Sequence, residues 1–168
     1  MSKSHNILFF ILVFLLQLAV SNYLNLGPWV MVTLVPFLIL QLPLPRSPHV
    51  VMLSAFGLGL LLDLLSAGVL GLNAFAAVMA AAPRKVLYRL LVNKDRQDAT
   101  WIPLLRDVGP GKYGRYLLAL TAIYLAAFIL LDCVSVRPLG FILVKWVAST
   151  LASTAAGLLL AYAFQRRS

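Results

Sequence analysis

Carboxylates are scarce in this sequence: its five acidic side chains are all aspartates, and it contains no glutamate. Asp63 is the most conspicuous, because it ends the apolar run Gly57-Leu58-Gly59-Leu60-Leu61-Leu62-Asp63. An intramembrane aspartyl protease needs two carboxylates that share a proton, one of them in a Gly-x-Gly-Asp arrangement. Leu60 stands where that acid is required, and Asp132 is a suitable second acid only if its helix lies beside that of Asp63. The pattern argues against this chemistry.

Other catalytic and metal-binding chemistries also lack their residues. A chain without glutamate cannot carry the His-Glu-x-x-His zinc motif. The single Cys133 excludes an intrachain disulfide and a cysteine-built metal site. The two histidines, His5 and His49, flank apolar runs, so no serine has a histidine base at membrane depth. We therefore expect a protein that is not an enzyme and that uses no metal and no cofactor.

The composition indicates a membrane protein. Hydrophobic residues make up 62% of the 168 positions and charged residues 11%, whereas a soluble domain is about half apolar and a quarter charged. The net charge is +9, and eight of the fourteen Lys and Arg residues lie in 84–115, beside apolar segments. This placement favours anionic lipid headgroups as the partner of these cations and argues against nucleic acid.

The apolar runs predict an all-α integral membrane fold, with one polytopic domain over residues 1–168. We expect six spanning helices at about 6–21, 28–42, 50–65, 69–91, 116–134 and 139–164, with 92–115 as a basic cytoplasmic loop. The run 50–82 as one helix would be about 50 Å long, beyond the roughly 30 Å of a bilayer core, so we divide it at 66–68. With six spans, both termini and twelve of the fourteen cations are cytoplasmic, as the positive-inside rule prefers.

Two further patterns predict contacts within the bilayer. Lys145 lies near the same outer face as Asp63, and we expect the two to form an ion pair, the alternative being that each reaches the headgroups independently. Small residues recur every four positions in the last helix, a spacing that lets helix backbones approach closely. Their partner is either this protein's own bundle or another membrane protein; the rows are Ala148, Ala152, Ala156 and Ser149, Ser153, Gly157.

The start of the basic region predicts a surface helix. Apolar residues at helical spacing lie opposite three cations, Arg84, Lys85 and Arg89. A helix of this kind lies along the membrane surface with its cations over the headgroups. We therefore expect these three side chains to face lipid.

The central motif resembles a known family signature. The run Gly57-Leu58-Gly59-Leu60-Leu61-Leu62-Asp63-Leu64-Leu65-Ser66-Ala67-Gly68-Val69-Leu70-Gly71-Leu72-Asn73-Ala74 is similar to that of MreD, the rod shape-determining membrane protein. That signature reads approximately Gly-Leu-x-x-Asp, a small-residue turn, and Leu-Gly-x-x-Ala. The resemblance extends to the His5-Asn6-Ile7-Leu8 start and to Gly111-Lys112-Tyr113. One departure is the second apolar run, which is less polar than in many family members.

The resemblance implies a non-enzymatic scaffold in the bacterial inner membrane that helps to maintain rod shape. Its implied partners are an MreC-like protein and, through it, a RodA-type glycosyltransferase, a penicillin-binding transpeptidase and MreB filaments, the machinery of lateral peptidoglycan synthesis. The motif residues to which a partner-binding or structural role carries over are Gly57, Gly59, Asp63, Gly68, Gly71 and Asn73.

The family's fold is thought to resemble the substrate-binding subunits of energy-coupling-factor vitamin transporters, which also have six helices. A small-molecule transport subunit is therefore the alternative function. Those subunits dock through Ala-x-x-x-Ala in the first helix, and the bulky run 7–16 has no such row. Few polar groups are available to bind a substrate in the core: Gln17, Asn73 and the hydroxyls of the last helix.

Overall fold

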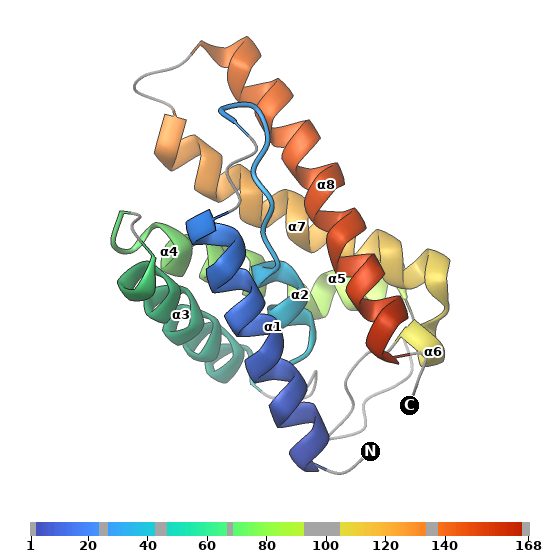
Figure 1. The fold of residues 1–168 in the computed structure, drawn as a ribbon. Coiled ribbons are helices and arrows are strands. Elements are labelled where there is room, and N and C mark those ends of the chain that lie inside the picture. The colour runs from blue at the N-terminus through green and yellow to red at the C-terminus, as the bar shows by residue number, and fades with distance from the viewer. Residues whose placement is uncertain are drawn as a thin grey trace.

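The computed structural model describes residues 3–23, 27–42, 47–66, 69–92, 105–133 and 138–165. Within these ranges the regular structure is entirely helical (Figure 1). The helices, in chain order, are α1 (Lys3–Tyr23), α2 (Val35–Leu40), α3 (Pro48–Leu65), α4 (Leu72–Ala81), α5 (Arg84–Leu91), α6 (Leu105–Val108), α7 (Pro110–Cys133) and α8 (Leu139–Gln165).

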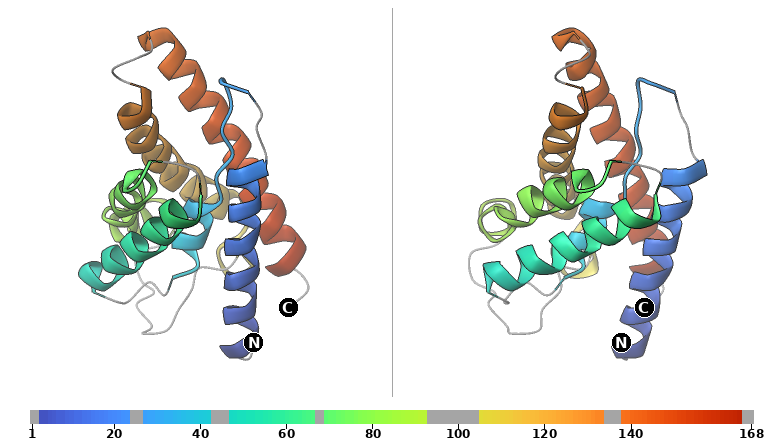
Figure 2. Two further views of the ribbon diagram at one scale, coloured as in Figure 1. Left: turned by 60° about the vertical axis from the view of Figure 1, so that its left-hand side comes forward. Right: turned by 90° about the vertical axis from the view of Figure 1, so that its left-hand side faces the viewer.

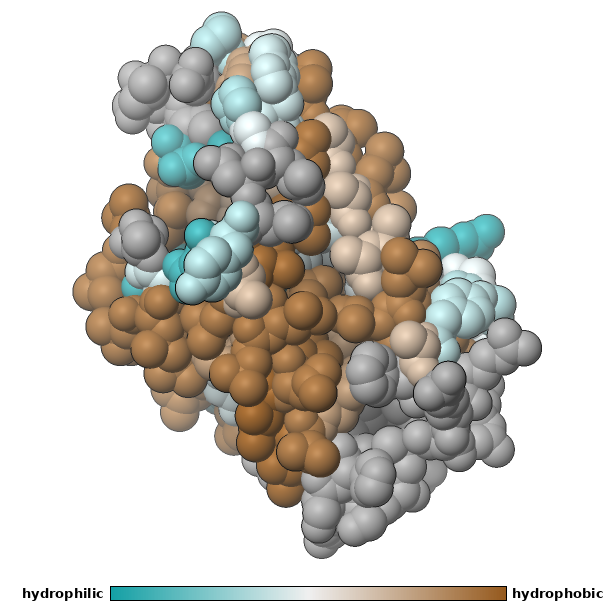
Figure 3. Space-filling view, in the orientation of Figure 1, coloured by the Kyte–Doolittle hydropathy of each residue, from teal (hydrophilic) through white to brown (hydrophobic). Residues whose placement is uncertain are grey.

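Three of these helices are long and apolar enough to cross a membrane: α3, α7 over Pro110–Asp132, and α8 over Leu139–Ala163. Shorter apolar helices cover Ile7–Tyr23 and Leu72–Ala81. Large hydrophobic side chains remain exposed along α1, α3 and α8, and Figure 3 shows them covering most of one face of the molecule. An apolar face of this extent is what lipid requires of a membrane protein.

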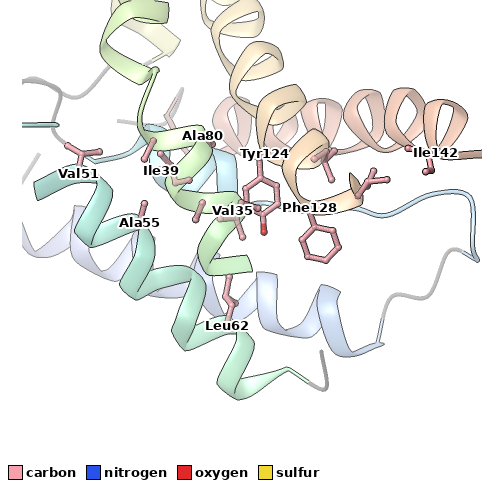
Figure 4. Packing of buried hydrophobic residues seen from close by; sticks show 14 residues of the cluster. Val35, Ile39, Val51, Ala55, Leu62, Ala80, Tyr124, Phe128 and Ile142 are labelled. Atoms are coloured by element: carbon pink, nitrogen blue, oxygen red, sulfur yellow. The ribbon is translucent and has the colours of Figure 1, made fainter. Parts of the chain in front are cut away.

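The helices are arranged around α4 and α7. Helix α3 packs on α4, α4 packs on α7, and α7 packs on α8. The beginning of α1 and the end of α8 lie at the same end of the molecule in all three views (Figures 1 and 2). Figure 4 shows the core between these elements, where Val35 and Ile39 of α2 lie among side chains of α3, α4 and α7.

The predicted second helix, 28–42, is wrong for most of its length. Residues 27–34 are not helical, and only Val35–Leu40 form a helix, with Pro36 in its first turn. Proline suits that position because the N–H that it lacks would have no intrahelical partner there. The physical reason for the difference is tertiary: side chains of α1 and α8 take the backbone N–H groups that a helix would have satisfied.

Other boundaries differ less. The predicted helix 69–91 is two helices, α4 and α5, separated at Ala82 and Pro83. Helix α7 begins at Pro110, six residues before the predicted start, and α6 lies within the predicted loop 92–115. Between α3 and α4 the chain leaves the helical conformation at Ser66, where φ is −102° and ψ is 154°. The turn at this point places the motif residues against one another.

Candidate functional site

The turn between α3 and α4 is organised by the Asp63 carboxylate, which is 3% exposed. Its Oδ2 accepts the backbone N–H groups of Gly71 at 2.9 Å and Ala74 at 3.1 Å. Its Oδ1 accepts the backbone N–H of Asn73 at 3.1 Å and the Asn73 side-chain amide at 2.8 Å. A carboxylate at the beginning of a helix satisfies N–H groups that have no intrahelical partner and interacts favourably with the helix dipole. Asp63 therefore caps α4 from the neighbouring helix.

Two glycines of the motif explain how α3 and α4 come so close. A Cβ on Gly59 would lie 2.5 Å from the Ala74 Cα, so only glycine lets α3 pack on the first turn of α4. Gly71, the N-cap residue of α4, has φ of 92°, a conformation that costs glycine little. Gly68 lies outside the described residues.

Gly57 faces the opposite way from Gly59. Two residues are about 200° apart around a helix, and a Cβ on Gly57 would meet none of the described atoms within 4 Å. Exposed Leu53 and Leu61 lie one turn before and one turn after it, at 71% and 44% exposure. Gly57 thus leaves a notch in an outward-facing apolar ridge of α3, which we call the α3 notch, defined by Leu53, Gly57 and Leu61.

The capping network continues into the core through Tyr124 of α7. Its hydroxyl donates to the Asn73 Oδ1 at 2.5 Å, and its ring is completely buried. The Tyr124 phenol also lies beside the side chain of Thr33, in the non-helical segment. Asn73 therefore connects the α3–α4 turn to α7.

The predicted ion pair between Asp63 and Lys145 is absent from the described contacts. Lys145 Nζ lies 3.2 Å from Asp132 Oδ2, so the lysine links α8 to the end of α7. Asp63 instead has four hydrogen-bond donors, all supplied by Gly71, Asn73 and Ala74. Three backbone N–H groups and the Asn73 side-chain amide replace the cation that we expected at Asp63.

One predicted small-residue row of α8 packs against the non-helical segment 27–34. Ser149 Oγ accepts the N–H of Met31 and Ser153 Oγ that of Thr33, each at 2.9 Å. Both serines are buried. From the other side, Gln17 Oε1 accepts the N–H of Leu34 at 2.5 Å. Irregular backbone is tolerated at membrane depth only where protein or water supplies such partners.

The remaining small residues of α8 divide between core and periphery. Gly157 is buried, and a Cβ there would lie 2.9 Å from a methyl group of Leu117. Ala148, Ala152 and Ala156 are all half-buried, and Ala156 packs against the core around Phe37 and Leu117. The Ser149, Ser153 and Gly157 row therefore faces the interior of this chain.

Arg84 does not face lipid as predicted. It is 3% exposed, and its Nη2 donates to the carbonyl oxygens of Leu40, at 3.1 Å, and Leu42 at the end of α2. A cation at a helix C-terminus stabilises the helix dipole and binds carbonyls that have no intrahelical partner. Burial lowers the pKa of the Arg84 guanidinium below its ordinary value, and nearby Tyr116 offsets part of that lowering. Arginine nevertheless stays charged at neutral pH.

Two nitrogen atoms of Arg84, Nε and Nη1, are buried and have no hydrogen-bond partner in the part of the chain that the structure describes. The same is true of Nε2 of Gln41. An unsatisfied buried donor costs about 1–3 kcal/mol, and a charged one more. The other two predicted lipid-facing cations, Lys85 and Arg89, are exposed, as are the apolar neighbours Val86 and Leu90.

The arrangement around Asp63 is suited to holding structure in place. All four donors on its carboxylate come from the α4 terminus, and the described His, Cys, Asp and Glu residues form no group of three that could hold a metal ion. Sequence reasoning identified Asp63, Gly59 and Asn73 as motif residues but missed Tyr124. No signal marks it, because a tyrosine within an apolar run reads as an ordinary core residue.

Comparison of the chain with models of protein families, with curated proteins and with solved structures gives no match. Any functional assignment therefore depends on the residues and their contacts.

Proposed function

We propose that this chain is a non-enzymatic membrane scaffold of the MreD type, which binds an MreC-like partner and helps to position peptidoglycan synthases. The α3 notch is the observation that carries the proposal. It lies in the segment that resembles the family signature. The space beside Gly57 is empty of described atoms, whereas α4 occupies the space beside Gly59. Small residues between larger apolar ones are how helices in lipid admit a neighbouring helix.

The rigid turn beside the notch supports the same role. Asp63 and Asn73 fix the beginning of α4 relative to α3, and Tyr124 ties this turn to α7. A surface fixed in this way loses little conformational freedom when a partner binds, which favours affinity. In this proposal the motif has two parts: an inner half that holds the turn and an outer half that contacts the partner.

The proposed setting is the bacterial inner membrane, with both termini in the cytoplasm and six crossings. The crossings would be α1, the segment 27–42, α3, α4, α7 and α8, with α5 along the cytoplasmic surface. The common end occupied by the start of α1 and the end of α8 agrees with an even number of crossings (Figure 2). The basic region 84–115 is then cytoplasmic, as the positive-inside rule prefers.

Affinity purification of the tagged full-length chain from native membranes tests the proposal, with mass spectrometry of the proteins that accompany it. We expect an MreC-like protein with the wild-type chain. A Cβ on Gly57 meets none of the described atoms within 4 Å, so Gly57→Leu should fill the notch and release the partner while the chain remains folded. Gly140→Leu is the matched control, because a Cβ on Gly140 also meets none of the described atoms within 4 Å.

Two outcomes contradict this proposal at different levels. If no MreC-like protein accompanies the wild-type chain, the scaffold function is wrong. If the partner accompanies both leucine variants equally, the scaffold function stands and the α3 notch is not its docking surface.

One observation favours the alternative, a small-molecule transport subunit. Residues 31–34 are irregular backbone held against the bundle by Gln17, Ser149 and Ser153, and transporters build substrate sites from interrupted helices. Here, however, these side chains are already engaged with the chain's own backbone. Organic extraction of the purified protein followed by mass spectrometry tests this: a stoichiometric vitamin-like molecule would favour the transport subunit.

A further inference from the structure

Three buried hydrogen-bond donors at and beside the end of α2 have no acceptor among the described residues. Arg84 is anchored there by the carbonyl oxygens of Leu40 and Leu42, and Gln41 is the residue between them. Arg84 Nε and Nη1 and Gln41 Nε2 are buried, and none has a partner among the described residues. Because all three groups are donors, they fit an acceptor with several oxygen atoms.

The described carboxylates do not supply that acceptor. Asp63 is occupied by the beginning of α4, and Asp132 pairs with Lys145. Asp107 is exposed on α6. The two other acids of the chain, Asp95 and Asp98, lie outside the described residues. The guanidinium thus carries a full charge that no described acid neutralises.

The surroundings favour a lipid phosphate over a free anion. Lys85 and Arg89 are exposed on the same short helix as Arg84, α5. Between and beside them are Val86 and Leu90, exposed to 58% and 73%. Cations interleaved with exposed apolar side chains are characteristic of a helix at the membrane interface, where acyl chains and headgroups meet. A soluble phosphate would make no contact with the exposed apolar side chains of this surface, whereas a lipid acyl chain would.

We propose that Arg84 and Gln41 form a specific site for the phosphate of an anionic phospholipid, with Lys85 and Arg89 at its entrance. A guanidinium binds two phosphate oxygens through parallel N–H groups, which a lysine cannot do. The inference is independent of the scaffold role, because it concerns the surface of α5 and not the α3 notch. Since the donors are buried in the chain alone, the lipid must displace neighbouring side chains to reach them, which makes its exchange slow.

The test uses the full-length protein purified in a mild detergent. Native mass spectrometry and thermal unfolding are measured with added phosphatidylglycerol, with phosphatidylcholine and with inorganic phosphate. We expect phosphatidylglycerol to remain bound through purification and to raise the Tm, since a ligand that binds only the folded state stabilises it. Phosphatidylcholine and inorganic phosphate should raise the Tm far less.

Variants identify the site. Arg84→Gln should weaken phosphatidylglycerol binding at least about tenfold, because it removes a charged, bidentate donor. Arg115→Gln is the matched control, since it removes an exposed cation at the beginning of α7 and should change binding little. Gln41→Leu removes one donor and leaves the Leu40 and Leu42 carbonyl oxygens for Arg84, so it should weaken binding severalfold in a folded protein.

Several results would overturn the inference. Equal binding by the wild type and Arg84→Gln would remove Arg84 from the site. If Arg84→Gln does not fold, unchanged binding by Gln41→Leu overturns the site instead. If phosphatidylcholine raises the Tm as much as phosphatidylglycerol does, the site does not recognise the net charge of the lipid. If inorganic phosphate raises the Tm as much, the donors bind a free anion instead of a lipid.

Discussion

The backbone N–H and the side-chain amide of Asn73 both donate to one oxygen of Asp63, at 3.1 and 2.8 Å. A residue at the start of α4 thus binds the same carboxylate oxygen of α3 twice. The amide oxygen of Asn73 in turn accepts the Tyr124 hydroxyl. Because each polar atom here has its partner within the network, removing one group leaves several others unsatisfied.

Asp63→Ala should destabilise the fold by about 2–4 kcal/mol, because the N–H groups that Asp63 caps lose their acceptor in a buried place. Asp63→Asn should also destabilise it, since its amide N–H₂ would face backbone N–H groups at one of the two oxygen positions. The measurement is the free energy of unfolding in mixed micelles titrated with sodium dodecyl sulfate. A fully stable Asp63→Ala variant would show that the cap is dispensable.

Gly59→Ala and Gly57→Ala form a matched pair on one helix. The Gly59 variant should lose about 1–3 kcal/mol, because its Cβ would lie 2.5 Å from Ala74 backbone and one of the helices must move. The Gly57 variant should be neutral or more stable by up to about 1 kcal/mol, as alanine is the better helix former. If both variants change the free energy of unfolding equally, the two glycines do not face opposite sides of α3.

Ser153→Ala should destabilise the protein by about 1–3 kcal/mol, because the buried N–H of Thr33 loses its acceptor. Thr150→Val is the control: its hydroxyl donates only to the Trp146 carbonyl oxygen within its own helix, so its loss should cost much less. Hydrogen exchange at Thr33 should rise in the serine variant alone. If both variants behave alike, the segment does not depend on this serine.

A double-mutant cycle separates the two possible partners of Lys145. Lys145→Gln with Asp132→Asn should give a coupling energy of up to about 1 kcal/mol, the range for partly exposed ion pairs. The aspartate is 39% exposed and the lysine 14%. Lys145→Gln with Asp63→Asn should show almost no coupling. A coupling at Asp63 as large as that at Asp132 would restore the pair that the sequence predicts.

Local patterns predicted the ends of the long helices well. Pro48 at the beginning of α3 and the small-residue break after Leu65 are properties of a few neighbouring residues, so they are legible in one sequence. The start of α7 was predicted six residues late, although Pro110 in its first turn is a signal of the same kind. Helix α8 was predicted almost to its boundaries because its apolar run is long and uninterrupted.

The errors came from contacts between distant segments. Residues 28–34 are as apolar as a helix in lipid, and their sequence does not show that serines about 120 residues later will bind their backbone. Arg84 was predicted as one of a surface cluster, because amphipathic spacing does not reveal that the carbonyl oxygens of Leu40 and Leu42, at and just after the end of α2, bind its side chain. For Asp63 we predicted an ion pair, because residue spacing does not show that backbone N–H groups will bind a carboxylate.

The irregular segment 27–34 has a consequence for biogenesis. Ser149 and Ser153 follow Met31 and Thr33 by 118 and 120 residues, and the ribosome delivers them late. Until α8 is synthesised, these N–H groups lack the partners that they have in the folded protein. Each unsatisfied group in the hydrocarbon core costs several kcal/mol of free energy. In the proposed six-crossing topology, we therefore expect the nascent segment to remain helical or at the headgroups until α8 is inserted. We expect a chain truncated before residue 149 to lack the final conformation of this segment, because both serine acceptors are missing.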